Sequence, residues 1–213
     1  MTLWDAMAYG TAGFTAGIAV VRMEHNGLKP ANGPVIVSGA TGGVGSIAIA
    51  ALAKLGYEVV ALTGKAGESD WLKRLGAKEI MLRSSLDLTK IKPLDKALWS
   101  AAVDNLGGEV LAWMASTMKV NGVIASIGLA ASPSLNTTVM PFILRGASLL
   151  GINSTDSPST ELRATVWRRL GSDMRPPMLK DMCRTIRFSE LPGVFDDFIN
   201  AKVSRRIVVD LNE

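Results

Sequence analysis

Four glycines fall within seven residues at one point of the chain, and the segments on either side make this turn the strongest constraint on the fold. Residues 35–37 are an unbroken apolar run, the turn occupies residues 39–45, and an apolar helix is expected over residues 47–55, ending at Gly56. A continuous apolar run of this length is typical of a strand covered on both faces. The order of strand, glycine turn and helix predicts the first βα unit of a parallel sheet.

The position of each glycine in this turn suggests a role for it. Gly39 can make the tight turn, and Gly45 permits the helix to pack closely on the strand. Gly42 and Gly43 let the backbone approach a pyrophosphate, which the N–H groups and the positive end of the helix dipole would face. A turn without any ligand is the alternative, but the strand and helix around it favour nucleotide binding.

Further strands and helices alternate along the middle of the chain. Strands are expected at residues 58–62, 79–82, 97–104, 122–128 and 147–152, and helices at residues 69–75 and 108–118. Alternation at this spacing builds βαβ units with right-handed crossovers, which form a parallel sheet with helices on both faces. Six strands with a glycine-rich first turn indicate an α/β fold, a Rossmann doubly wound parallel six-stranded sheet.

Two flanking regions lie outside this predicted sheet. Residues 5–24 are expected to be helical, with small side chains on one face. The C-terminal region is expected to be a tail of helices and a strand. Its helices are predicted at residues 160–170, 179–186 and 191–201, and its closing strand, at residues 207–209, has a partner that the sequence leaves open.

The end of the second strand indicates which dinucleotide would bind. An NAD site usually has Asp or Glu at this place, to accept a hydrogen bond from the ribose 2′-hydroxyl. The chain has Thr63-Gly64-Lys65 instead, and a hydroxyl, a backbone N–H and a cation suit a 2′-phosphate. Arg83, just past the third strand, adds a second cation. The sequence therefore favours NADP over NAD, with an ordinary solvated loop lysine as the alternative.

The ends of the fifth and sixth strands are candidates for the nicotinamide half of the cofactor. In a doubly wound sheet, residues 126–130 and 151–154 would open onto the crevice at the carboxyl edge. We expect them to contact the nicotinamide half through backbone groups. Ordinary βα loops without a ligand are the alternative.

Cysteine and histidine counts exclude several classes of site. The chain has one cysteine, Cys183, and one histidine, His25, so an intramolecular disulfide or a zinc site built from several Cys and His ligands cannot form. We therefore expect no metal and a reducing compartment. His25 is interpreted as a helix-end residue and Cys183 as a core residue of an apolar helix. No Ser-His-Asp or paired-carboxylate constellation is found.

The charge pattern does not indicate a nucleic-acid or membrane partner. The net charge is +4, but the basic residues are scattered among acids, and the arginine pairs 168–169 and 205–206 are not interleaved with aromatic residues. No charged residue lies between Lys29 and Lys54, yet the glycine turn interrupts this run, which a membrane-spanning helix would need intact. Without a recognisable secretory signal, the protein is expected in the cytoplasm.

Several segments together resemble one known family. Residues 37–46, 54–61, 72–77 and 138–145 are similar to the zinc-independent medium-chain dehydrogenase/reductases, in particular to the quinone-oxidoreductase-like branch that includes NADPH-dependent acryloyl-CoA reductases. The segment 138–145, Thr-Val-Met-Pro-Phe-Ile-Leu-Arg, is the most specific, because it serves no general nucleotide-binding purpose. Residues 10–16 also resemble the family's helix at the domain junction.

The resemblance implies a division of the chain. Residues 1–27 would be a junction helix and residues 28–158 the NADP-binding Rossmann domain. Residues 159–213 would be a segment that packs with an N-terminal GroES-like catalytic domain, which is expected to be missing from this chain.

The resemblance also implies a set of cofactor-binding residues but identifies no catalytic one. Pyrophosphate would be bound by Thr41, Gly42, Gly43 and Val44. The adenosine 2′-phosphate end would be held by Thr63, Gly64, Lys65 and Arg83, and the nicotinamide side would be lined by Leu129, Ile143, Ser154 and Asn200. Lys65 stands where the family often has Arg, which retains the charge but loses the bidentate fork.

The implied chemistry is hydride transfer from NADPH to an activated C=C bond, in a small-molecule substrate such as acryloyl-CoA or a quinone. An NADPH-binding module without turnover is the second hypothesis, because half of the substrate cleft would be missing. A short-chain-type enzyme is a third, disfavoured because neither Tyr9 nor Tyr57 has Lys four residues later. Uncovered apolar faces on the first helix and the tail would promote self-association, so a homo-oligomer is expected.

Overall fold

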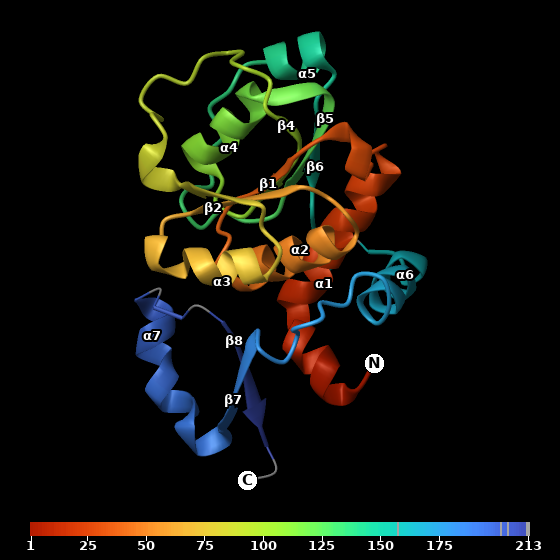
Figure 1. Ribbon diagram of the computed structural model, residues 1–213, viewed down its shortest axis with the longest axis vertical. Coiled ribbons are helices and arrows are strands. Elements are labelled where there is room, and N and C mark those ends of the chain that lie inside the picture. The colour runs from red at the N-terminus through yellow and green to blue at the C-terminus, as the bar shows by residue number, and fades with distance from the viewer. Residues whose placement is uncertain (157, 201, 204, 212–213) are drawn as a thin grey trace.

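A parallel sheet of six strands forms the centre of the molecule. The computed structural model describes residues 1–156, 158–200, 202–203 and 205–211. The strand order is β3-β2-β1-β4-β5-β6. Figure 1 shows the sheet in the upper part of the view, above β7 and β8. The bounds are β1 Val35–Val37, β2 Val59–Thr63, β3 Glu79–Leu82, β4 Trp99–Asp104, β5 Met118–Ser126 and β6 Ser148–Gly151. This is the doubly wound Rossmann order, so the fold predicted from the sequence is confirmed.

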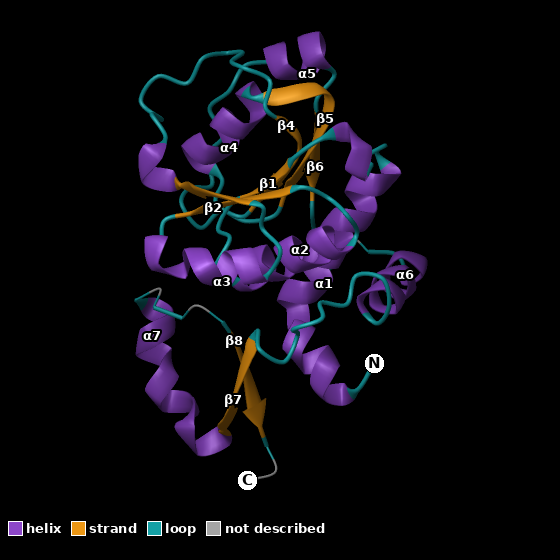
Figure 2. Cartoon of the chain, in the orientation of Figure 1, coloured by secondary structure: helices purple, strands orange, loops and turns teal. Residues whose placement is uncertain are grey.

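Helices lie on both faces of this sheet (Figure 2). One face is covered by α1 (Leu3–His25), α2 (Gly43–Lys54) and α3 (Ser69–Arg74), and the other by α4 (Gly108–Ser116). α5 (Met140–Arg145) directly precedes β6. Short 3-10 helices occupy three connections: η1 (Pro30–Asn32), η2 (Ala66–Glu68) and η3 (Arg83–Ser85). Among the helices in the described ranges, none combines the length and the apolar character needed to cross a membrane.

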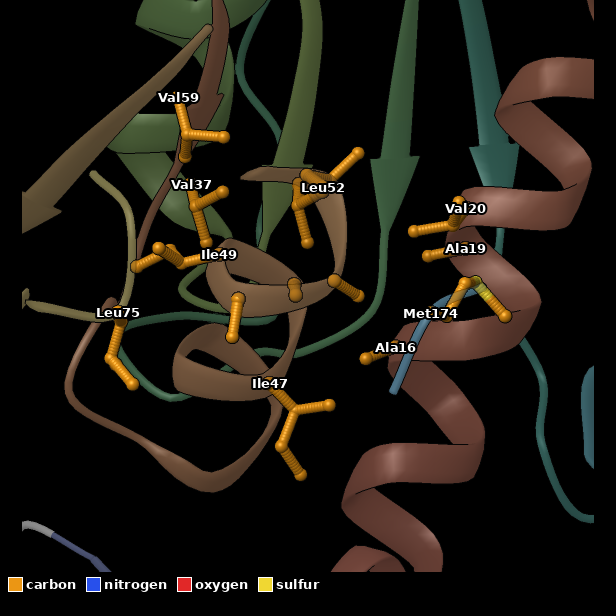
Figure 3. Packing of buried hydrophobic residues seen from close by; sticks show 14 of the residues in the cluster. Ala16, Ala19, Val20, Val37, Ile47, Ile49, Leu52, Val59, Leu75 and Met174 are labelled. Atoms are coloured by element: carbon orange, nitrogen blue, oxygen red, sulfur yellow. The ribbon is translucent and has the colours of Figure 1, made fainter. Parts of the chain in front are cut away.

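Alternate strand residues supply the two halves of the hydrophobic core. Val35 and Val37 of β1 pack into the cluster formed with α1 and α2, whereas Ile36 packs into the cluster formed with α4. The division follows from the strand itself, since successive side chains point to opposite faces. Figure 3 shows part of the first cluster, with Ile49 of α2 and Val20 of α1 among its members. Both faces of β1 are therefore buried, as its unbroken apolar sequence predicted.

α1 bends at Gly10 and then packs against α6 (Thr160–Leu170). Gly10 has φ +50° and ψ −156°, a conformation that side chains disfavour. Farther along, a Cβ on Gly17 would lie 2.6 Å from Cγ1 of Val166, so glycine is what allows the two helices to approach. The buried hydroxyl of Tyr9 donates to the Leu170 carbonyl at 2.8 Å, and burial raises the pKa of Tyr9 to about 12.

The tail after α6 differs from the prediction. The helix predicted over residues 179–186 is wrong, because turns continue to residue 182 and are followed by β7 (Cys183–Arg187). This strand pairs in parallel with β8 (Arg206–Asp210), which supplies the partner that the sequence left open (Figure 2). Ile186 is the one buried residue of β7, so its own sequence marks this strand weakly, and the pairing with β8 makes it favourable over a helix.

The last predicted helix is shorter than expected and begins later. Residues 191–201 were expected to be one helix, whereas the structure has the 3-10 helix η4 (Phe188–Val194) followed by α7 (Phe195–Ile199). Pro192 lies within this stretch, and a proline has no N–H to donate to the preceding turn. Residue 201 lies outside the described residues.

Candidate cofactor-binding site

The glycine turn lies at the carboxyl edge of the sheet, between β1 and α2. Gly39 has φ +58°, and its carbonyl accepts a hydrogen bond from the N–H of Gly42 at 2.9 Å. Gly42 is the N-cap of α2, and no side chain in the described part of the chain caps this helix end. The first N–H groups of α2 consequently lack intrahelical partners. This is the arrangement with which helix N-termini bind phosphate oxygens.

Two of these glycines are constrained in different ways. A Cβ on Gly45 would lie 2.4 Å from the Gly39 carbonyl oxygen and 2.9 Å from Cα of Ala40, which confirms the packing role predicted for Gly45. A Cβ on Gly42 would meet the same oxygen at 3.2 Å, a contact that a small shift relieves. Gly42 is also exposed. Gly45 is therefore required by the fold, whereas Gly42 leaves the outer surface of the turn open.

An arginine from the tail lies beside the same turn. Nη1 of Arg206 in β8 lies 3.2 Å from the point where Gly43 would carry a Cβ, and Nη2 lies 2.7 Å from the corresponding point of Gly10. Its Nε donates to the Ala8 carbonyl at 3.1 Å. Burial lowers the pKa of Arg206 from its ordinary value, yet a guanidinium remains charged at neutral pH. The bend of α1 thus holds a cation at the N-terminus of α2.

The end of β2 forms a second polar turn next to the glycine turn. Thr63 is buried, and its Oγ1 accepts a hydrogen bond from the N–H of Lys65 at 3.0 Å, which fixes the turn through Gly64. Nζ of Lys65 donates to the Val203 carbonyl at 3.4 Å. β1 and β2 are neighbours in the sheet, so the ammonium group of Lys65 and the glycine turn lie on the same edge. Thr41, Gly43 and Val44, all partly exposed, complete the glycine turn.

Arg83 lines a cavity on this edge. It is exposed and follows β3 directly. The cavity has a volume of about 480 Å³ and is also lined by Gly107 and Gly108 at the start of α4 and by Ser132 after β5. All these residues follow the carboxyl ends of strands. The structure therefore places Arg83 on the same edge as Lys65, in the lining of a hollow of small-molecule size.

A buried carboxylate joins the end of β4 to the glycine turn. Asp104 accepts hydrogen bonds from the hydroxyl of Ser38 at 2.9 Å and from the N–H groups of Leu106 at 3.1 Å and Gly107 at 2.9 Å. The Ser38 hydroxyl in turn accepts from the N–H of Asn105 at 2.9 Å. Burial raises the pKa of Asp104, although the three donors act in the opposite direction. This network fixes the crevice between β1 and β4, where the strand order reverses.

Two of the four residues predicted for the nicotinamide side lie at this edge. Leu129 follows β5 and is 65% exposed, and Ser154 follows β6 and is half-buried. Because β5 and β6 are neighbouring parallel strands, their carboxyl ends bring these residues to the same side of the sheet.

Ile143 and Asn200, the other two residues predicted for the nicotinamide side, lie elsewhere in the structure. Ile143 is on α5, where Arg145 donates to the carbonyl of Met118 at the start of β5, so this helix lies at the amino edge. Asn200 follows α7 in the tail, and its Nδ2 donates to the Asp196 carbonyl at 2.7 Å. The structure does not bring Ile143 together with the glycine turn, and its contact with the nicotinamide stays a prediction.

The histidine and the cysteine both lie outside this site. His25 is the last residue of α1, as expected. Cys183 begins β7 rather than lying in a helix; it is half-buried, and burial raises the pKa of its thiol. Within the described residues, no group of three or more His, Cys, Asp or Glu side chains is arranged to hold a metal ion.

Comparison with known proteins assigns the chain to a family. The sequence model of the zinc-binding dehydrogenase family matches residues 43–171, more than half of the chain. The acrylyl-CoA reductase AcuI of Ruegeria pomeroyi is 46% identical over 209 residues, which cover 98% of this chain and 63% of that protein. The chain belongs to the medium-chain dehydrogenase/reductase family, in its quinone-oxidoreductase-like branch.

Two solved structures of medium-chain dehydrogenase/reductases are very similar to the chain. Protein YhfP of Bacillus subtilis, solved with NAD bound, is 45% identical with a TM-score of 0.95, over 99% of this chain and 64% of that one. The YhdH oxidoreductase of Salmonella enterica, solved with NADP, is 41% identical with a TM-score of 0.92, over 97% of this chain and 63% of that one. The chain thus spans less than two thirds of the length of these relatives.

Sequence reasoning missed two residues of this candidate site. In the sequence, Arg206 stands out only as part of a basic pair, because its place beside the turn depends on the pairing of β8 with β7 and on the bend of α1. Asp104 was seen only as the last residue of a strand. A carboxylate at the buried end of a strand is itself a signal, since it must find donors to remain there.

Proposed function

We propose that the chain binds NADP at its carboxyl edge and forms the cofactor-binding portion of a reductase of activated C=C bonds. The observation that carries this proposal is the uncapped N-terminus of α2, with Arg206 on one side and Lys65 on the neighbouring strand end. Backbone donors and two cations in this arrangement suit a dinucleotide with an additional phosphate. The similarity to AcuI supports an acyl-CoA thioester such as acryloyl-CoA as substrate, and a quinone is the other substrate class considered.

Different groups of residues would bind different parts of the cofactor. Thr41, Gly42, Gly43 and Val44 would bind the pyrophosphate, with Arg206 as a further cation. Thr63, Gly64, Lys65 and Arg83 would hold the 2′-phosphate. Leu129 and Ser154, which lie at the carboxyl edge, are proposed for the nicotinamide side, whereas the contacts expected of Ile143 and Asn200 stay predictions. NADPH would supply the hydride. The chain's own contribution would be to bind and orient it, so that one face of the nicotinamide is presented at the crevice.

NADP is preferred over NAD in this proposal because of the residues at the end of β2. Relatives have been solved with either dinucleotide, so the family alone does not decide the question. In this chain, the hydroxyl of Thr63 orders a turn that presents Lys65 rather than a carboxylate. A carboxylate would repel the 2′-phosphate, whereas an ammonium group attracts it.

The proposal includes a division into domains. Residues 1–27 would be the junction helix and residues 28–158 the NADP-binding domain. Residues 159–213 would pack with a GroES-like catalytic domain in the whole enzyme. Exposed apolar residues of α1 and α7 support this arrangement, including Leu3 at 89% and Ile199 at 81% exposed.

A module that binds NADPH without turnover is the second candidate. The observation that favours it is the open nicotinamide side, where Leu129 is 65% exposed. The two candidates share the binding step and differ only in hydride transfer.

Titration of the purified chain with NADPH and NADH tests the binding step. Quenching of tryptophan fluorescence reports the binding. We expect both dinucleotides to bind saturably, with a lower dissociation constant for NADPH. Arg206→Met should weaken both dinucleotides, because both have the pyrophosphate, while Arg184→Met, an exposed arginine of β7, is the matched control. Absence of binding, or tighter binding of NADH, would contradict the proposal.

A further inference from the structure

A second cavity lies at the amino edge of the sheet, at the ends of the strands remote from the glycine turn. It has a volume of about 310 Å³ and lies between the end of α1, η1, β4 and the start of β5. In Figure 1 the end of α1 lies beside β5 and β6, on the side of α5 and away from β7 and β8. We name it the amino-edge cavity. Its polar lining side chains are Asn26, Asn32, Ser100, Lys119 and Asn121.

An irregularity in strand pairing opens this cavity. Trp99 of β4 pairs with Met118 of β5, but Ala101 pairs with Val123, so four residues of β5 leave the ladder opposite Ser100. These residues, 119–122, form a bulge within β5 in which Asn121 has φ +56°. As a consequence, Ser100 has no paired residue on β5, and it lines the cavity.

Two hydrogen-bond donors converge on the same space. Ser100 is 5% exposed, and its Oγ has no hydrogen-bond partner among the described residues. Oγ of Ser100 and Nζ of Lys119 lie 3.0 Å and 2.5 Å from the point where Gly33 would carry a Cβ. Gly33, with φ +118°, carries no side chain, so both donor atoms can lie beside its backbone. A buried hydroxyl without a partner is rare in a native fold and indicates a missing ligand or water.

The charge in this cavity is positive. None of the ion pairs found in the described ranges includes Lys119. The carboxylates of two neighbouring segments are already engaged, because Glu24 of α1 pairs with Arg169 and Glu58 before β2 pairs with Lys78. Among the residues that the structure describes, no carboxylate lines the cavity. A ligand that contacts Lys119 therefore brings the first negative charge to it.

The remaining lining determines what kind of anion fits. Oδ1 of Asn32 accepts from the N–H of Lys29 at 2.6 Å, which leaves its Nδ2 as a donor. Leu28 and Val123, both buried, form an apolar part of the wall. A site with an ammonium group, a hydroxyl and an amide donor beside aliphatic side chains is suited to a carboxylate with a short aliphatic chain.

We propose that the amino-edge cavity binds a short-chain aliphatic carboxylate, at a site separate from the dinucleotide. The carboxylate oxygens accept from Nζ of Lys119 and Oγ of Ser100, and the aliphatic chain lies against Leu28 and Val123. The proposal does not depend on the cofactor, because the two sites are at opposite edges of the sheet.

Propionate is the probe for the main experiment, with the backbone amide signals of the full chain followed by NMR. We expect saturable shifts confined to residues around Gly33 and Asn121, unchanged in the presence of saturating NADPH. Lys119→Met should weaken propionate at least tenfold, whereas Lys73→Met, an exposed lysine of α3, should leave the affinity unchanged. Propionamide, which lacks the charge, should bind at least tenfold more weakly than propionate.

Three results would overturn the proposal. Shifts spread over the whole surface would mean non-specific binding. Equal effects of Lys119→Met and Lys73→Met on propionate affinity would show that Lys119 is not the cation that binds the carboxylate. Inorganic phosphate binding as tightly as propionate would mean that the aliphatic wall has no role and that the ligand class is wrong.

Ser100→Ala separates a binding role from a structural one. Because the hydroxyl has no partner in the described structure, its removal should leave the melting temperature unchanged or raise it, while weakening propionate severalfold. A melting temperature lowered by several degrees with unchanged propionate affinity would show that the hydroxyl stabilises the fold instead. This variant keeps the proposal testable even if Lys119→Met does not fold.

Discussion

Lys65 is held by a turn that its neighbour orders, and its ammonium group lies at the end of β2. Replacing it with Ala removes a charge-assisted contact to the 2′-phosphate, worth about 1.5–3 kcal/mol. We expect NADPH affinity to fall by roughly ten- to a hundredfold and NADH affinity to change little, as measured by fluorescence titration of both cofactors. Lys73→Ala serves as control. Equal losses of affinity for both dinucleotides would show that Lys65 does not contact the 2′-phosphate.

Asp5 makes the stability of the fold depend on pH. The Arg175 guanidinium, at 2.8 Å, and the N–H of Thr2, at 3.0 Å, hold the pKa of this carboxyl well below its usual range. An unfolded Asp has a pKa of about 3.9, so the stabilisation is fully present above that pH and is lost as the pH falls through the lower pKa of the folded state. Asp5→Asn should cost about 1–2 kcal/mol at pH 7.

Urea denaturation of Asp5→Asn and of the wild type, measured between pH 7 and pH 2, checks this expectation. The difference in unfolding free energy should shrink as the pH falls below about 4. Asp181→Asn, at an exposed side chain, should differ little from wild type throughout. A constant difference for Asp5→Asn at every pH would mean that the helix cap alone, and not ionisation, provides the stabilisation.

Individual site residues were predictable where a local pattern determines them. Thr63 and Lys65 follow a strand that the sequence already reveals, so their position at the sheet edge required no knowledge of the tertiary structure. Arg206 and Asp104 were not predictable in the same way. The place of Arg206 depends on a bend in α1, and the role of Asp104 depends on the hydroxyl of Ser38 from another strand.

Among the elements, the turn between β1 and α2 contains two glycines with different expected roles. Gly42 is proposed to bind the cofactor, and Gly45 is needed for the fold. Gly42→Val places a branched side chain on the open surface of the turn, so we expect a folded protein that no longer binds NADPH or NADH. Gly45→Val forces a Cβ to within 2.4 Å of the Gly39 carbonyl oxygen and should lower stability by at least ~2 kcal/mol. Circular dichroism with thermal melting, followed by cofactor titration, measures both effects. Normal NADPH binding by folded Gly42→Val would show that phosphate binds elsewhere.

The elements of the sheet could be predicted well because each is marked in its own sequence. β1 is apolar throughout and α6 begins after Ser159, whose hydroxyl caps the helix by accepting from the N–H of Leu162. The tail lacks such marks. Residues 183–187 become a strand only because β8 lies alongside, and the two strands are separated by η4 and α7.

At the scale of the whole molecule, exposed apolar side chains gather on the first turns of α1 and in the tail. Leu3 and Met7 of α1 are 89% and 61% exposed, and Phe188 and Phe198 of the tail are 59% and 53% exposed. Such groups usually mark interaction surfaces. We expect the purified chain to self-associate, with a mass in light scattering that rises with concentration. Leu3→Ser combined with Phe198→Ser should reduce this association without changing NADPH affinity.

The exposed surfaces of α1 and the tail also affect the rate of turnover that we expect from this chain. If the groups that position the enone belong to a further domain, the chain should reduce acryloyl-CoA with NADPH far more slowly than a two-domain reductase, since loss of positioning costs several kcal/mol of barrier. Steady-state kinetics beside such a reductase measures the difference. Comparable turnover would mean that the 213 residues contain a complete substrate site.

Arg206 donates to a carbonyl that lies 198 residues earlier in the chain, which has a consequence for how the protein is made. The glycine turn and α2 leave the ribosome long before β8 does, by on the order of ten seconds at ordinary rates of translation. During that interval the nascent chain has the turn proposed to bind phosphate but lacks Arg206. If the proposed binding is right, cofactor would stabilise the chain more after β8 has paired with β7 than before, so it would favour the folded tail instead of guiding the early stages of folding.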